Sequence, residues 1–346
     1  MGKRILTASS IRALRNCRKS YFWRYVEELS PVRTDAALRI GSVFHECLER
    51  WFRLDLEGKP KDETAVAAIL AHIDESFPNR AGDPEQNRLW HQTRGMVVGY
   101  VARYPAESFR VVAVEQTFEC PIIHPATGRA SRTFRLAGKV DALVQDPDSG
   151  EYYIMEHKST SQIGGSAIEK LPLDFQVHAY VLGLSRSLGI PIAGVIYDVT
   201  AKVALKQRVA ETTADFEARR SELLLKSRSG KTSAVQRQAE ADSEFQARVA
   251  ERYRDPEMFL RETLYVSQAD VDEVEAEIWE LTQQLLTAHR TGVFYRNDAL
   301  CFQFNRPCAY FPLCRAGGNP NFVENLYEKR PAHSELATNG DESPAF

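Results

Sequence analysis

Residues 138–158 read Gly-Lys-Val-Asp-Ala-Leu-Val-Gln-Asp-Pro-Asp-Ser-Gly-Glu-Tyr-Tyr-Ile-Met-Glu-His-Lys. The even positions from Leu136 to Val144 are apolar or small, which predicts a strand that carries Asp141 on its other face. Turn residues at 146–150 separate this strand from a second, mostly apolar one, so the two form a hairpin whose second strand is central in its sheet. Glu156 and Lys158 are two residues apart and share a face, so we expect them beside Asp141.

Two carboxylates and an ammonium group on one sheet predict a divalent-cation site. A surface ion pair at a solvated strand end is the ordinary alternative, but it fits poorly because the run 152–155 should lie deep in the sheet. Carboxylate oxygens suit Mg²⁺ or Mn²⁺, and a neighbouring Lys can orient or deprotonate a metal-bound water. The chemistry that this pattern indicates is phosphodiester hydrolysis.

These residues resemble the PD-(D/E)XK nuclease superfamily, in its RecB-like branch of CRISPR-associated single-strand exonucleases and phage nucleases. Gly138-Lys-Val-Asp141 and Glu156-His-Lys158 match the branch's Asp and Glu-x-Lys, although the Pro of the name is absent. The resemblance implies an α/β fold, with a mixed central sheet flanked by helices and a core at about 109–200.

A second motif of the branch is similar to Gly41-x-x-x-His45, on a helix predicted over Arg39–Trp51. A lone His on a helix is more often a core or surface residue. The resemblance implies instead that His45, Asp141, Glu156 and the backbone carbonyl of His157 hold the metal. It also implies that Lys158 positions the attacking water.

A further helix is expected over 174–184, and it carries Gln176 and Tyr180 on one face. The pattern Gln-x-x-x-Tyr after Glu-x-Lys resembles the branch's signature and implies that both residues support the metal and the DNA strand. The small, polar segment 159–169 predicts a mobile loop over the site, and 192–200 a further strand.

Cys301-x(6)-Cys308-x(5)-Cys314 predicts a metal site, because a cytoplasmic chain would keep these thiols reduced. Three thiolates are one ligand short of a tetrahedral site, and Cys17 would complete it. One N-terminal and three C-terminal cysteines resemble the iron–sulphur staple of the same branch, which implies a [4Fe–4S] cluster joining the two ends of the chain. Zinc stays open, because spacing does not separate the two. The other two cysteines, Cys47 and Cys120, are predicted to be structural.

The rest of the chain supplies scaffold. A helix over 9–28, capped by Ser9 or Ser10, carries Cys17, and helices over 63–76 and 85–103 follow. A strand over 109–120 contains Glu115, which lies either at the edge of the metal site or unpaired on the solvent side. Residues 121–132 are expected to be a connecting loop, 259–266 a strand, and 267–289 a helix capped by Ser267.

Segment 202–253 is the least informative. Between Arg219 and Arg237 six basic residues face a single acid, Glu222. This pattern fits either a solvated, partly disordered insertion or a flexible basic arm that contacts the phosphate backbone.

Composition indicates a soluble globular chain of 346 residues with a net charge of −3, so any DNA contact must come from local patches. No apolar run approaches a membrane span and residues 1–10 are unlike a signal peptide, which predicts a cytoplasmic protein without a membrane partner. We expect one nuclease domain over 1–330, with helical and iron–sulphur elements at 9–105 and 201–315, and a disordered tail at 331–346.

The expected function is that of a metal-dependent DNA nuclease. The resemblance implies an exonuclease on single-stranded DNA in recombination, replication or CRISPR-type DNA processing, working with a helicase, recombination or CRISPR-adaptation partner. Two alternatives stay open: a non-catalytic DNA-binding or assembly module that keeps the fold, and a sequence- or structure-specific endonuclease. The absence of a phosphate-binding Gly-x(4)-Gly-Lys-[Ser/Thr] loop excludes a helicase.

Overall fold

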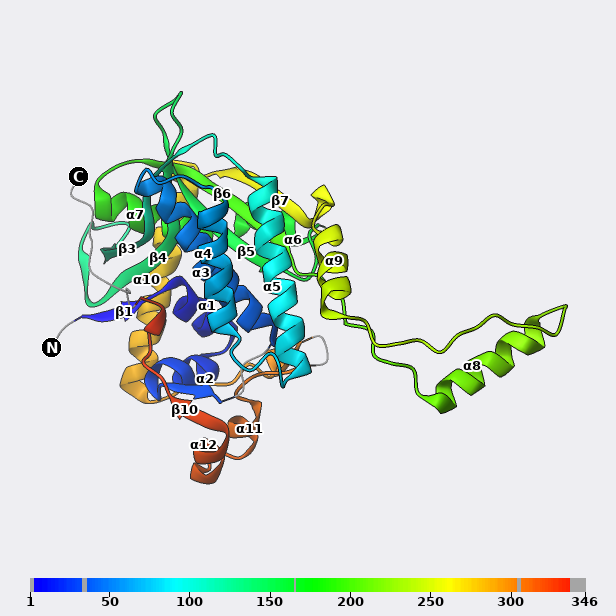
Figure 1. Ribbon diagram of the computed structural model, residues 1–346. Coiled ribbons are helices and arrows are strands. Elements are labelled where there is room, and N and C mark those ends of the chain that lie inside the picture. The colour runs from blue at the N-terminus through cyan, green and yellow to red at the C-terminus, as the bar shows by residue number, and fades with distance from the viewer. Residues whose placement is uncertain (1–2, 33–35, 165, 304–305, 337–346) are drawn as a thin grey trace.

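The computed structural model describes residues 3–32, 36–164, 166–303 and 306–336 (Figure 1). In this part of the chain the centre is a six-stranded mixed sheet with the order β1-β4-β5-β6-β7, in which β3 pairs with the free edge of β4. Its strands are β1 (Arg4–Leu6), β3 (Arg110–Ile123), β4 (Ala130–Gln145), β5 (Tyr152–Thr160), β6 (Ile192–Ala201) and β7 (Phe259–Tyr265). The predicted hairpin is β4–β5, and β5 is central because β6 runs parallel to it on the other side.

Helices cover both faces of this sheet. On one face pack α1 (Ala8–Asn16), α7 (Phe175–Leu188) and α10 (Gln268–Thr291), with Ile11, Leu184 and Ile278 in a shared core. On the other face pack α3 (Ala36–Leu56), α4 (Glu63–Ser76), α5 (Pro84–Arg103) and α9 (Asp242–Arg252), around side chains such as Phe44 and Tyr100. Burial on both faces explains the continuous apolar run in β5. The predicted fold class, a mixed sheet flanked by helices, is confirmed.

The N-terminal helix differs from its prediction. Its cap is Thr7 rather than Ser9 or Ser10, because Thr7 accepts the N–H of Ser10 (3.2 Å) while Thr7 donates its own N–H to the Ser10 hydroxyl (2.8 Å). The helix ends before Cys17, whose backbone is extended, and resumes as α2 (Arg18–Tyr21) and a π-helical turn over Phe22–Val26. The prediction of one continuous helix over 9–28 was therefore wrong. Cys17 lies at the break between two helical segments.

Other boundaries also moved. Half of the expected loop at 121–132 is strand, since β3 runs to Ile123 and β4 begins at Ala130. The expected loop at 159–169 is shorter, because β5 continues to Thr160 and α6 covers Ser166–Glu169. Strand β7 and helix α10, which Ser267 caps, confirm their predictions.

The two ends of the described chain meet in a small C-terminal unit. Strand β2 (Leu29–Pro31) pairs with β10 (Tyr327–Lys329), and the hairpin of β8 (Phe302–Gln303) and β9 (Arg306–Pro307) precedes α11 (Phe311–Arg315) and α12 (Pro320–Leu326). Leu29, Tyr310, Leu313 and Tyr327 form its core.

The first part of the segment that was expected to be a tail, 331–336, lies among the described residues. A 3₁₀ turn covers Ser334–Leu336, where Glu335 accepts a hydrogen bond from the Thr7 hydroxyl (3.3 Å). The rest of the predicted tail, 337–346, lies outside the described residues. Within the described ranges, no helix is both long enough and apolar enough to span a membrane.

Gly138 is a glycine for steric reasons. A Cβ atom there would lie 2.5 Å from Cζ of Phe118 and 3.2 Å from Cε1 of Tyr180. We therefore expect Gly138→Ala to lower the free energy of unfolding by about 1–3 kcal/mol, measured by urea denaturation. Gly82→Ala is the control, because open space surrounds that position. Equal stability of the two variants would show that the crowding around Gly138 is not real.

Candidate active site and metal centres

The site opens where β4 and β5 separate. Their backbone ladder ends at the pair Ala142–Met155. Beyond this pair, the N–H of His157 donates to the Asp141 side chain, at Oδ2 (2.7 Å). Strand β3 occupies one edge of β4, and both β1 and β5 pair with the opposite edge. Strand β1 pairs with Phe134–Leu136, whereas β5 pairs with 142–145. The gap between these two partners exposes Asp141.

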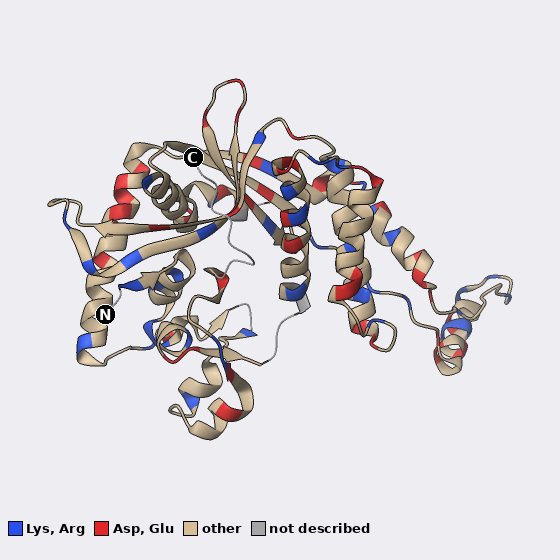
Figure 2. Cartoon of the chain, turned by 60° about the vertical axis from the view of Figure 1, so that its left-hand side comes forward, with Lys and Arg blue, Asp and Glu red and all other residues tan. Residues whose placement is uncertain are grey.

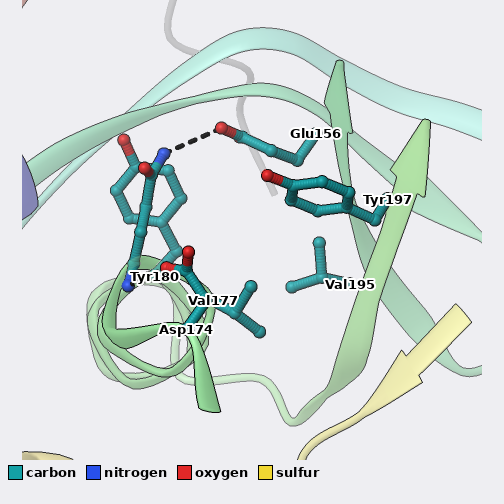
Figure 3. Close-up of a pocket in the computed structure, with 7 residues that line it drawn as sticks. Glu156, Asp174, Val177, Tyr180, Val195 and Tyr197 are labelled. Carbon is teal, nitrogen blue, oxygen red and sulfur yellow. Dashed lines mark hydrogen bonds between the residues drawn. The ribbon is translucent and has the colours of Figure 1, made fainter. Parts of the chain in front are cut away.

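Strand β5 presents Glu156 and Lys158 on one face, and their side chains form an ion pair. Glu156 is 5% exposed, and the Gln176 amide on α7 donates to its Oε1 (2.8 Å, the dashed line in Figure 3). Burial raises the pKa of Glu156, against the influence of the ammonium group. Burial would lower the pKa of Lys158, but the Glu156 and Asp141 carboxylates outweigh it and raise that pKa, so the amine stays protonated.

Helix α3 brings His45 to the same site. Its Nδ1 lies 3.7 Å from Oδ1 of Asp141. Gly41, one turn earlier, allows the helix to approach β5, since a Cβ there would lie 3.1 Å from Oγ of Ser159. Burial disfavours charge on both groups, yet their attraction prevails: the pKa of His45 is raised and the pKa of Asp141 is held well below its usual range.

The side of the site next to α7 is lined by residues that include Glu156, Tyr180 and Tyr197 (Figure 3). Tyr180 was predicted to lie there, and burial raises its pKa. Tyr197 was not predicted. Because β6 pairs parallel to β5, Tyr197 lies opposite Glu156, and its ring extends toward that carboxylate. The alternation in the predicted strand 192–200 tells which residues share a face with Tyr197, but only the register between β5 and β6 shows that this face carries Glu156.

Asp174 is a second residue that the sequence did not point to. It caps α7 by accepting the N–H of Gln176 (2.7 Å), and it pairs with Arg12 of α1 (3.2 Å). It also lines the pocket beside Glu156. Asp174 therefore sets where α7 begins, and with it the position of the Gln176 side chain.

Glu115 lies on the side of the site next to α3. It lines the same pocket as His45 and Asp141 and forms an ion pair with Lys139, so the alternative of an unpaired solvent-side residue is wrong. Burial raises the pKa of Glu115. Its backbone is left-handed (φ 54°) inside β3, a conformation that costs a non-glycine residue about 1–3 kcal/mol.

Behind the site, the side chain of His157 points into a buried polar network that the sequence did not predict. Its Nδ1 lies 3.2 Å from Oδ2 of Asp198 on β6. The same oxygen accepts from the Tyr100 hydroxyl (2.5 Å) and from Arg261 Nη2 (3.0 Å), and Arg261 also pairs with Glu107. The network fixes β5, β6, β7 and α5 relative to one another at the level of the site.

Removal of Asp198 should be costly, because it is 1% exposed and its loss leaves buried donors unpaired. We expect Asp198→Ala to reduce the free energy of unfolding by about 3–5 kcal/mol. Its control is Glu251→Ala, which breaks an exposed pair with Arg254 and should cost less than about 1 kcal/mol. Chemical denaturation measures both; an Asp198 variant as stable as the control would mean that the network does not stabilise the fold.

The model of the PD-(D/E)XK nuclease superfamily matches residues 5–315, most of the chain and the whole of the site. The chain belongs to this superfamily. It is thus a member of a group of nucleases that typically use Mg²⁺ or Mn²⁺ and act on DNA. No curated protein matches the chain.

The chemistry of the donors at the site fits such a cation. Asp141 and Glu156 offer carboxylate oxygens and His45 an imidazole nitrogen, which suit Mg²⁺ and Mn²⁺. In the ranges that the structure describes, no three His, Cys, Asp or Glu side chains form a ready-made metal site. Each donor has a protein partner instead: Lys158 for Glu156, and His45 with the His157 N–H for Asp141. Metal binding by this nuclease would have to exchange some of these contacts.

The four predicted cysteine ligands line one pocket, although within the described ranges they do not form a ready-made metal site either. Cys17, from the helix break, lines one pocket with Cys301, Cys308 and Cys314. The N–H of Asn297 donates to Sγ of Cys17 (3.4 Å), which ties the N-terminal thiol to the C-terminal segment.

The remaining two thiols are core residues, as predicted. Cys47 and Cys120 are at most 1% exposed. Burial raises the pKa of Cys47 to about 12 and that of Cys120 to about 11, so both stay protonated. All six cysteines are free of disulfides.

Proposed function

We propose that this nuclease is a metal-dependent exonuclease of the RecB-like branch that acts on single-stranded DNA. The observation that carries the proposal is the convergence of Asp141, Glu156 and Lys158 at the point where β4 and β5 separate, with His45 and Gln176 beside them. The Gly138, His45 and Gln176–Tyr180 motifs that resemble this branch all lie around the same opening.

Each residue has a distinct role in the proposal. Asp141, Glu156, His45 and the carbonyl of His157 would hold Mg²⁺ or Mn²⁺, which supplies an activated water and charge neutralisation at the scissile phosphate. The Lys158 ammonium group orients the attacking water and stabilises the negative charge that develops on the phosphate. Gln176 donates a hydrogen bond to the Glu156 carboxylate. Tyr180 lines the same pocket and would contact the DNA strand.

We further propose that Cys17, Cys301, Cys308 and Cys314 bind a [4Fe–4S] cluster, with Zn²⁺ as the alternative. Their shared pocket supports this, since four thiolates suit either group. The cluster would join both ends of a single nuclease domain over residues 1–330. The proposed setting is recombination, replication or CRISPR-type DNA processing, in which the protein would act with a helicase or another partner.

Substrates with and without ends separate an exonuclease from an endonuclease. We expect the protein with Mn²⁺ to degrade linear single-stranded DNA and to leave circular single-stranded DNA of the same sequence intact. Labels at the 5′ or 3′ end of the linear DNA then give the polarity. Cleavage of the circle would identify an endonuclease, and preference for linear duplex would refute the strand preference.

A further inference from the structure

An arm that consists of residues 204–240 leaves the body of the protein between β6 and α9 (Figure 1). It contains helix α8 (Thr213–Lys226) between two extended segments and projects away from the sheet and its covering helices. In the described part of the chain, no side chain of α8 is buried. Folding of the nuclease core alone therefore does not explain the arm.

The chain just before the arm lies next to the strand and helix that carry site residues. Lys158 is followed on β5 by Ser159 and Thr160, and the N–H of Lys202 donates to the Thr160 carbonyl (2.6 Å). A Cβ at Gly41, one turn before His45, would lie 3.6 Å from Nζ of Lys202. The chain that leaves the site thus leads into the base of the arm.

Two carboxylates hold the arm in shape. At its base, the buried Glu240 accepts the N–H of Arg208 (2.9 Å) and pairs with Arg248 of α9 (2.8 Å). Further out, Glu211 binds Arg219 through two hydrogen bonds (2.6 and 2.7 Å), and its N–H donates to the Arg237 carbonyl (2.9 Å). These contacts join both extended segments to α8, so the arm has internal hydrogen bonds and ion pairs of its own while its helix stays solvated.

The outer part of the arm is basic although the chain is acidic overall. Residues 204–240 contain eight Lys and Arg against five Asp and Glu, in a chain with a net charge of −3. Figure 2 shows how charged residues of both signs are distributed over the chain. Arg219 is bound to Glu211 and Lys226 to Glu222. Arg220, Arg228 and Lys231 are exposed and, within the described residues, form no ion pair.

We propose that this arm binds the phosphate backbone of the DNA strand that the active site cleaves. This proposal rests on the proposed function. It adds a second contact between the protein and the DNA, outside the active site. Three unpaired cations on a projecting element fit a polyanion, and they contact phosphates without reading sequence. A protein partner would rely on the arm's exposed aliphatic side chains, Leu225 and Val235, instead.

Salt-dependent DNA binding tests the proposal on the full-length protein. The probe is a fluorescent single-stranded oligonucleotide, with chelator present to prevent cleavage. Arg220→Ser, Arg228→Ser and Lys231→Ser combined should weaken binding about 10- to 100-fold at low salt. They should also reduce the slope of log affinity against log salt by about 2, since each lost phosphate contact on a single strand removes about 0.7.

Two controls accompany the Ser variant. Combined Arg220→Lys, Arg228→Lys and Lys231→Arg keep the charge and should bind as the wild type does. Leu225→Ser with Val235→Ser should also leave binding unchanged. Unchanged affinity and slope in the Ser variant would overturn the proposal. A loss of binding confined to the aliphatic variant would also overturn it, because it would indicate apolar rather than ionic contacts with the DNA.

Failure of this proposal is distinguishable from failure of the proposed function. Metal-dependent cleavage of a short oligonucleotide depends on the active site, so the Ser variant should retain it. A Ser variant that cleaves normally and binds normally refutes the arm's role alone. A wild type that cleaves nothing refutes the proposed function.

Discussion

Replacement of Asp141 by Asn is expected to reduce DNA cleavage by on the order of 1,000-fold or more, about 4 kcal/mol of transition-state stabilisation. Asp141 joins the elements of the site, since it contacts His45 from α3 and the backbone of β5. The amide removes the negative charge that a divalent cation requires but keeps the size and one acceptor oxygen. The measurement is single-turnover cleavage of end-labelled single-stranded DNA with Mn²⁺, together with DNA binding, which should persist.

Asp148→Asn is the matched control for this variant. The same chemical change is made on the same hairpin, but Asp148 lies in the exposed turn between β4 and β5. It should cleave DNA at the wild-type rate. An Asp141→Asn protein that cleaves as fast as the Asp148→Asn protein would show that the chemistry takes place elsewhere.

If Cys17 is a ligand of the proposed cysteine-bound metal, its replacement by Ser is expected to reduce the metal content of the purified protein and to lower the melting temperature by on the order of 10 °C. Cys17 is the single N-terminal member of the quartet, and the pocket joins it to the C-terminal unit. Bound metal supplies folding free energy only while its ligand set is complete. Elemental analysis of anaerobically purified protein distinguishes iron from zinc, and calorimetry gives the melting temperature.

Cys47→Ala serves as the control for the Cys17 variant. Cys47 is a buried thiol of α3, remote from the quartet in the fold. It should keep the full metal content and lose only the small stabilisation of its core contacts. Equal metal content and equal melting temperature in the Cys17 and Cys47 variants would refute a structural metal at the quartet.

The sheet and the candidate site were largely predictable because their signals are local. Alternation, turn residues and helix caps each involve residues only a few positions apart in the sequence. The hairpin with Asp141 and Glu156 and the helix with Gln176 could therefore be predicted from spacing. The helix break at Cys17 was not predictable in this way. Its surrounding residues favour a helix, and the extended backbone at Cys17 accompanies contacts to Asn297, far away in sequence.

Residue spacing could not predict the contacts between strands that are distant in sequence. Tyr197 lies opposite Glu156 only because β6 pairs with β5 in one particular register. The buried network around Asp198 likewise requires β7 to place Arg261 beside it. Glu115 was a candidate with two interpretations, and only its ion pair with Lys139 and its shared pocket with Asp141 separated them.

Metal-dependent cleavage by the wild-type protein tests the central claim most directly. Anaerobically purified protein is incubated with end-labelled single-stranded DNA in Mn²⁺, in Mg²⁺ or in chelator, and the products are resolved on a denaturing gel. The proposed site predicts shortening of the DNA in either metal and none in chelator. Intact DNA in both metals, or equal cleavage in chelator, would contradict a metal-dependent nuclease centred on Asp141, Glu156 and Lys158.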